Sequence, residues 1–266
     1  MIAAVSFSAQ ADLYNQVATP NTGNGEMIFG TGVTNEKWTT DATANGLELA
    51  LRGKLRHNPA DSNNPANIYN SNGDGTYSFV TGGPGGATAV WSFEWSVNTN
   101  TNNATAGARS LESYTYMLGI DSNPSLSANY MMFDLINGGD PTKGNMKCWD
   151  HSIGTNATTN ANDSVADCSA ANAASREADY AALLSNSVAQ NSWKPHWFIP
   201  GFDPTQDGVY NFFLSASDQS GEVARTDIQI IVGRGSDQYI PEPASLALVG
   251  VALAGLAVSR RRKQAK

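Results

Sequence analysis

Two cysteines and a nearby histidine are the first residues of this sequence that could do chemistry. Cys148 and Cys168 bracket a segment rich in Ser, Thr, Asn and Ala, and His151 lies three positions after Cys148. A nucleophilic cysteine needs a base that a third group orients, and a second cysteine competes for the thiol. We therefore predict a Cys148–Cys168 disulfide, provided that the chain is exported, with a nucleophilic Cys148 as the alternative. By the chain-entropy estimate such a bridge stabilises the fold by about 3 kcal/mol.

Metal ligands are sparse. The histidines have no i, i+2 or i+4 spacing that would form a local metal cluster; they are His57, His151 and His196. Residues 70–75 match the first half of an EF-hand calcium loop, but its twelfth position is Thr81 and not a bidentate Glu. Three aspartates near predicted strand ends form a second candidate: Asp203, Asp207 and Asp218. We expect no metal site and no cofactor, with calcium at one of these loops as the alternative.

Carboxylate pairs are the usual machinery of glycoside hydrolases. Glu94 lies on the polar side of an aromatic segment, and Glu112 and Asp121 follow it in sequence. The Glu-x-Asp-x-x-Glu spacing of sandwich-type glucanases is absent. We expect no catalytic residue and no enzymatic activity, and keep a β-sandwich hydrolase as an alternative.

Tryptophans in or beside loops offer flat rings on which a sugar could stack. Trp149, Trp193 and Trp197 are the predicted glycan contacts. The competing interpretation places them in the core, because Trp packs well between sheets.

Short alternating segments separated by turn residues must position these groups. In residues 90–97 Trp91, Phe93 and Trp95 share one side and Glu94 lies on the other, which predicts a half-buried strand. Further strands are predicted at 47–55, 75–80, 113–120, 130–136 and 196–199. Residues 170–184 have a helix-forming composition and predict one helix.

The most regular alternation of apolar and polar residues lies in the last strands before the C-terminal tail. Residues 207–217 and 222–233 alternate, and Asp218 to Gly221 favours a type I turn. This pair resembles the last hairpin of immunoglobulin-like extracellular β-sandwiches. The predicted fold is mainly β, an antiparallel β-sandwich of immunoglobulin-like or jelly-roll-like type with one short helix.

Both ends of the chain read as targeting segments. Ala9-Gln-Ala11 has the form of a signal-peptidase site, and we expect a basic segment upstream of Met1. At the other end, Pro241-Glu242-Pro243 precedes an uncharged apolar run at 244–258. A basic stop follows: Arg260, Arg261, Arg262 and Lys263. A helix over this run rises about 22 Å, short of the ~30 Å hydrocarbon core. Because arginine stems extend it and basic residues stay cytoplasmic, we predict a single transmembrane helix.

Together, the Pro-Glu-Pro signature, the apolar helix and the basic cluster resemble the PEP-CTERM sorting signal of Gram-negative bacteria. The resemblance implies export, a transient stay in the inner membrane, processing near Pro241-Glu242-Pro243 by an exosortase, and an association with exopolysaccharide and biofilm. The expected divisions are 1–11, a signal-peptide remnant; 12–236, the exported domain; 237–243, a linker; and 244–266, the membrane helix with its basic cytoplasmic end.

The net negative charge of the chain restricts the classes of molecule that it could bind. The net charge is −8, and removing the tail leaves 11 basic against 24 acidic residues, near −13. Such a surface disfavours nucleic acid and anionic lipid. From the PEP-CTERM resemblance we expect a structural protein at the cell surface or in the extracellular exopolysaccharide layer. A carbohydrate-binding module for that polysaccharide is the first alternative, and a hydrolase is the second.

Overall fold

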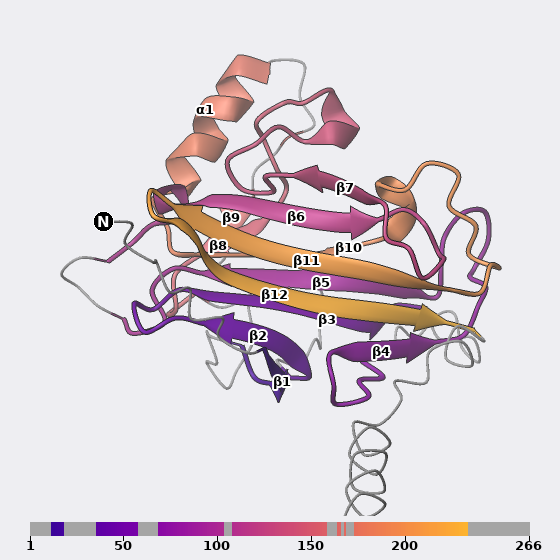
Figure 1. Ribbon diagram of the computed structural model, residues 1–266. Coiled ribbons are helices and arrows are strands. Elements are labelled where there is room, and N and C mark those ends of the chain that lie inside the picture. Colours follow the sequence, from indigo (N-terminus) through magenta and orange to yellow (C-terminus); the bar gives the residue numbers. More distant parts are fainter. Residues whose placement is uncertain are drawn as a thin grey trace, which may run out of the picture.

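The computed structural model describes residues 12–18, 36–57, 69–103, 108–158, 164–165, 168 and 173–233. Within them the chain forms two β-sheets and one α-helix (Figure 1). The seven-stranded sheet has the order β1 (Leu13–Gln16), β2 (Trp38–Ala42), β3 (Glu48–Leu55), β5 (Trp91–Asn98), β10 (Val188–Trp193), β8 (Ser152–Gly154), β9 (Ser164–Val165). The five-stranded sheet has the order β4 (Thr76–Phe79), β12 (Gly221–Val232), β11 (Gly208–Asp218), β6 (Thr115–Asp121), β7 (Tyr130–Phe133). The helical elements are α1 (Ala173–Leu183) and three 3-10 turns, η1 (Leu111–Ser113), η2 (Pro141–Lys143) and η3 (Pro195–Trp197).

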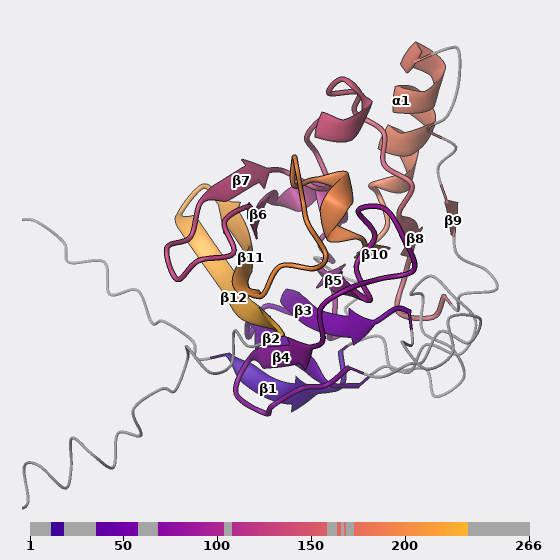
Figure 2. The same ribbon diagram turned by 90° about the vertical axis from the view of Figure 1, so that its right-hand side faces the viewer.

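The two sheets face each other (Figure 2). Aromatic side chains fill the core between them. Phe93 of β5 lies 4.6 Å from Phe212 of β11, centroid to centroid, and Trp91 lies 5.4 Å from Tyr210. Alternation along each strand places one face of each sheet in this core. Gly53 in β3 permits the close approach, because a Cβ there would lie 2.8 Å from the Cβ of Tyr77. The predicted mainly β fold is confirmed.

One strand pair corrects the expectation of a wholly antiparallel arrangement. β4 pairs with β12 in parallel, with Thr76 opposite Gln229 and Phe79 opposite Val232. A hairpin forces its strands to be antiparallel, but these two strands lie far apart in the chain and no hairpin constrains them. The five-stranded sheet is therefore mixed, and the immunoglobulin-like or jelly-roll-like type stays a prediction.

The prediction that residues 90–97 form a half-buried strand is correct about the strand and wrong about its burial. Every residue of β5 is buried, including those of its polar face. Glu94 on that face is bound by Arg52 and Lys54 of β3, and Ser96 accepts a hydrogen bond from Gln190 of β10. Polar groups can be buried where they bind one another, and alternation alone does not reveal that.

The terminal hairpin and the helix are confirmed. β11 and β12 pair antiparallel along their length, and the Ser220 amide donates to Asp218 Oδ1 in the turn (2.8 Å). The strand predicted at 196–199 is wrong. Pro195 begins the 3-10 turn η3, which a proline at the first position favours, and the strand β10 precedes it.

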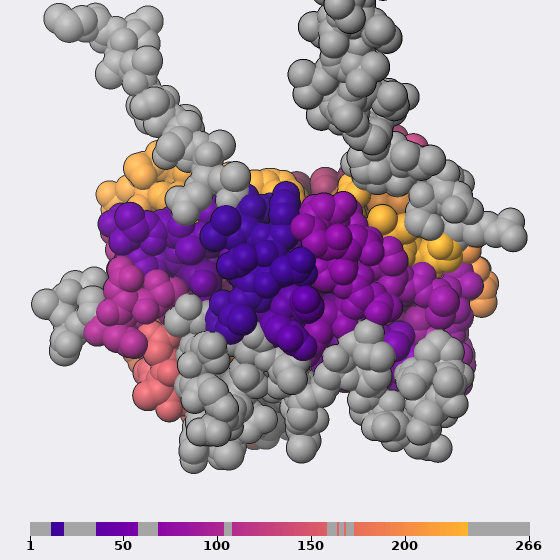
Figure 3. All heavy atoms as spheres, turned by 90° about the horizontal axis from the view of Figure 1, so that it is seen from below, coloured from indigo at the N-terminus to yellow at the C-terminus, as the bar shows by residue number. Residues whose placement is uncertain are grey.

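Seen from below, the segments coloured indigo to purple form a continuous surface, to which the edge strand β1 contributes (Figure 3). Leu13 and Tyr14 of β1 are exposed there. Among the described residues no helix is long and apolar enough to cross a membrane. The predicted membrane helix at 244–266 lies outside the described residues.

Candidate functional site

The predicted disulfide is confirmed. Cys148 and Cys168 form a bridge with an S–S distance of 2.07 Å and a Cα–Cα distance of 5.5 Å. Since Cys148 carries no free thiol, the alternative of a nucleophilic cysteine does not hold. The bridge anchors the segment that carries Trp149.

The three tryptophans predicted as glycan contacts meet at one pocket of about 310 Å³, which we call the aromatic pocket. Its lining residues are Asp140, Thr142, Lys143, Trp149, Asp150, Trp193, Trp197 and Phe198. Trp149 and Trp193 are buried, with 1% and 3% of their surface exposed, whereas Trp197 is 45% exposed. Two of the three rings therefore form the floor, and one ring is open to a ligand.

Each ring is held by the element that carries it. Trp193 is the last residue of β10, and Pro195 then begins the turn η3, which brings Trp197 to the rim. Trp149 donates from Nε1 to the carbonyl oxygen of Gly138 (3.0 Å) and stacks on Trp193 at 5.4 Å. Because these side chains interlock, the floor of the aromatic pocket is pre-formed.

The polar side of the aromatic pocket comes from η2 and from Asp150. Asp140 caps η2, because its Oδ1 accepts from the amide and the hydroxyl of Thr142 (2.8 and 2.6 Å). Lys143 Nζ lies 3.7 Å from Asp140 Oδ2 and 3.9 Å from Asp150 Oδ1. A mainly apolar wall with a few polar groups is the usual make-up of a small-molecule site. An aromatic plane beside carboxylates suits the faces and hydroxyls of a sugar.

His151 lies beneath this floor and is fully buried. Its Nε2 is 2.7 Å from the carbonyl oxygen of Leu135, which can only accept, so Nε2 carries the proton. Nδ1 then accepts from Asn191 Nδ2 at 3.2 Å. Burial lowers the pKa of His151 to about 4, with a smaller opposing effect from the Leu135 hydrogen bond. The ring is therefore a neutral structural group.

The carboxylates considered for hydrolysis hold the structure together. Glu94 is fully buried, and its Oε2 lies 2.6 Å from Arg52 Nη2. Burial raises the pKa of Glu94, but the charges of Arg52 and Lys54 outweigh burial, so the pKa is lowered. Asp121 is also buried and accepts from the amides of Asn123 and Asn129 (3.0 and 2.8 Å). Glu112 is exposed on η1.

The calcium candidates are turns closed by their own side chains. Asp74, Asp203 and Asp218 each accept from the amide two residues further on, at 2.8–3.0 Å. Asx-turns of this kind need no cation. Within the described residues no group of three His, Cys, Asp or Glu side chains could hold a metal ion.

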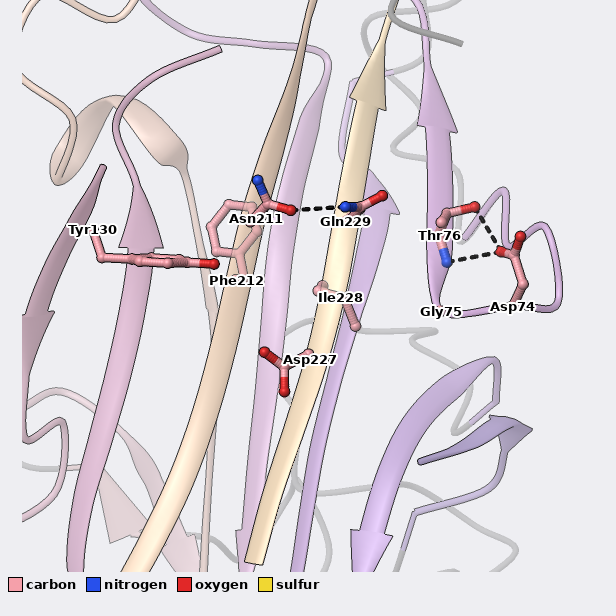
Figure 4. A pocket seen from close by; sticks show the side chains of 9 residues that line it. All are labelled: Asp74, Gly75, Thr76, Tyr130, Asn211, Phe212, Asp227, Ile228 and Gln229. Atoms are coloured by element: carbon pink, nitrogen blue, oxygen red, sulfur yellow. Dashed lines mark hydrogen bonds between the residues drawn. The ribbon is translucent and has the colours of Figure 1, made fainter. Parts of the chain in front are cut away.

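Sequence reasoning missed a groove of about 450 Å³ on the outer face of the five-stranded sheet (Figure 4). Asn211 and Gln229 project from neighbouring strands, with Asp227 beside them and Tyr130 reaching over from β7. Gln229 Nε2 donates to Asn211 Oδ1 at 2.8 Å, and Asn211 Nδ2 donates to Asp121 Oδ2 at 2.9 Å. Asn211 among the outward positions of β11 was the available signal. Because these groups bind one another, they stabilise the sheet surface.

The sorting residues Pro241, Glu242 and Pro243 and the basic stop Arg260, Arg261, Arg262 and Lys263 lie outside the described residues. A family model for the PEP-CTERM protein-sorting motif matches residues 240–263. Comparisons with curated proteins and with solved structures gave no match. The chain is thus a mainly β protein that carries a PEP-CTERM sorting signal. The signal implies export of a membrane-transiting precursor and processing by an exosortase, and the β domain is assigned to no family.

Proposed function

We propose that this protein is a non-enzymatic component of the exopolysaccharide layer, delivered and processed through its tail. The observation that carries the proposal is the sorting motif at residues 240–263 behind a disulfide-bonded β domain. A disulfide suits an oxidising extracellular location. The two facing sheets fit a sandwich of immunoglobulin-like or jelly-roll-like type, an architecture widespread among cell-surface domains.

The structural role is favoured over a hydrolase by what the carboxylates already do. Glu94 binds Arg52 and Lys54, and Asp121 binds backbone amides. A general acid and a nucleophile must both face the scissile bond, and neither of these buried carboxylates reaches solvent. We propose that the domain works without a cofactor.

The test is the distribution of the protein in its producing organism, with and without exopolysaccharide synthesis. We expect it in the polysaccharide fraction of the first strain and in the culture medium of the second. The same distribution in both strains would contradict residence in that layer.

Carbohydrate binding at the aromatic pocket is the second candidate function, and the exposed ring of Trp197 above two buried tryptophans favours it. Replacing Trp197 by Ala removes the open stacking surface and should weaken co-sedimentation with the organism's exopolysaccharide by roughly three- to tenfold. Tyr14→Ala is the matched control, because Tyr14 is an exposed aromatic residue on β1, outside the aromatic pocket. Equal losses in the two variants would refute a site at Trp197.

A further inference from the structure

The C-terminal ends of the strands β3 and β10 bring basic residues together in the seven-stranded sheet. β3 and β10 both run antiparallel to β5, so they run parallel to each other and their C-terminal ends lie on the same side of the sheet. Leu55 at the end of β3 is opposite Trp91, and Trp193 at the end of β10 is opposite Phe93. The two strands flank β5 and therefore lie about 9–10 Å apart.

Four basic residues lie within three positions after these strand ends, and we call them the basic cluster: Arg56, His57, Lys194 and His196. Arg56 Nη1 reaches across to Ser192 Oγ of β10 at 3.0 Å, which ties the two strand ends together. Lys194 Nζ lies 5.8 Å from the ring centroid of Trp197. The basic cluster therefore adjoins the open ring of the aromatic pocket.

Within the part of the chain that the structure describes, the basic cluster has no salt-bridged carboxylate of its own; burial lowers the pKa of Arg56, and the charge of Glu94 partly offsets this. None of its four members forms a salt bridge there. The neighbouring Glu94 is already bound by Arg52 at 2.6 Å and by Lys54 at 3.3 Å. His57 Nε2 and His196 Nδ1 are buried and have no hydrogen-bond partner among the described residues. These two nitrogens are the kind of orphaned buried groups that a ligand satisfies.

Burial and neighbouring positive charges lower the pKa values of three members of the basic cluster. Burial, followed by the charge of Arg56, lowers the pKa of Lys194. Burial, followed by the charges of Lys194 and Arg56, lowers the pKa of His57. For His196 the causes of the lowered pKa are burial and Lys194. Like charges held together destabilise each other unless a counter-charge lies between them.

We infer that Arg56, His57, Lys194 and His196 form a site for an anionic group, and that its ligand is the carboxylate of an acidic sugar residue. The inference rests on the glycan contact proposed at Trp197 and adds the chemical class of the glycan. A sugar ring stacked on Trp197 would place a carboxylate beside Lys194. The net charge near −13 of the processed chain disfavours a densely charged nucleic acid as the source of the anionic group.

The test compares an oligogalacturonate with its methyl ester, which has the same chain without charge, by calorimetric titration of the full-length protein in nonionic detergent. We expect the acid to bind more tightly than the ester. Lys194→Gln and His196→Gln should each weaken acid binding about tenfold, the effect of one charged hydrogen bond, and leave ester binding unchanged. Lys147→Gln is the matched control, because Lys147 is an exposed lysine outside the basic cluster.

Three outcomes would overturn the inference. The acid and the ester could bind equally, or Lys147→Gln could weaken acid binding as much as Lys194→Gln does. The third is that neither probe binds while the native exopolysaccharide still co-sediments, in which case the acidic-sugar inference fails and the proposed function stands. Unchanged thermal unfolding of each variant ensures that a loss of binding is not a loss of fold.

Discussion

Replacing His151 by Gln should make the stability of the protein less dependent on pH. The ring is fully buried, donates from Nε2 to Leu135 and accepts at Nδ1 from Asn191. Burial lowers its pKa from 6.5 to about 4. Between these two values the unfolded chain binds a proton that the folded chain excludes, so protons favour unfolding. Stability is therefore lost as the pH falls from about 6.5 to about 4, and no further loss from this group follows below that.

The size of the effect follows from the shift in pKa. Each unit corresponds to about 1.4 kcal/mol, so the wild type should lose about 3 kcal/mol of unfolding free energy that His151→Gln does not lose. Asp12 acts in the opposite direction, because burial raises its pKa to about 6 and its stabilising effect is lost as the pH rises from 3.8 through 6. Since Asp12 is present in both proteins, its contribution cancels in the difference between them.

Urea unfolding at several pH values between 7.5 and 4 measures this difference. At pH 7.5 the variant should be the less stable protein, because Gln does not replace the ring contacts with Trp149 and Trp95. Its deficit should shrink by about 3 kcal/mol as the pH falls to 4. Parallel stability curves for the two proteins would refute the assignment of His151 as a buried neutral ring.

Three further changes test the core around the site. Cys148→Ser combined with Cys168→Ser should lower the unfolding free energy by about 3 kcal/mol, measured in denaturant, and unchanged stability would show that the bridge adds nothing. Glu94→Gln leaves the charges of Arg52 and Lys54 buried beside a neutral amide and should cost about 3–5 kcal/mol; a loss below 1 kcal/mol in thermal unfolding would contradict that buried network. Trp193→Ala should cost about 3–5 kcal/mol, and equal destabilisation by Trp197→Ala, which removes an exposed ring of the same pocket, would contradict the burial of Trp193.

Short sequence patterns predict the hairpin, the helix and the disulfide, because these features depend mainly on residues close together in the sequence. The β11–β12 hairpin was readable because alternation and the turn residues Asp218 and Gly221 agree. The helix was readable from composition, and the disulfide from two cysteines in a chain with export signals.

The remainder depends on contacts between distant residues. The alternation of β5 predicts one buried face, but Arg52 and Lys54, far away in the sequence, bury the other by binding Glu94. The parallel β4–β12 pair joins strands that lie far apart in the sequence, and no connecting turn predicts this pairing. At residues 196–199 the run of aromatic residues predicts a strand, but Pro195 begins a 3-10 turn there.

Of the site, the residue types were predictable and their burial was not. The sequence predicts Trp149, Trp193 and Trp197 in or beside loops, and the structure gathers them at one pocket. Sequence does not reveal that two of the rings form the floor and that only Trp197 is open. The sequence does not indicate the basic cluster, because its members meet only when β3 and β10 flank β5.

We propose that this protein reaches the exopolysaccharide layer after its tail has been processed. The mass of the protein recovered from the washed exopolysaccharide of the producing organism tests this proposal. We predict a chain that ends near Pro241-Glu242-Pro243 and lacks the apolar segment and the basic residues 260–263. An intact tail on the protein, recovered only from the inner membrane, would contradict the account.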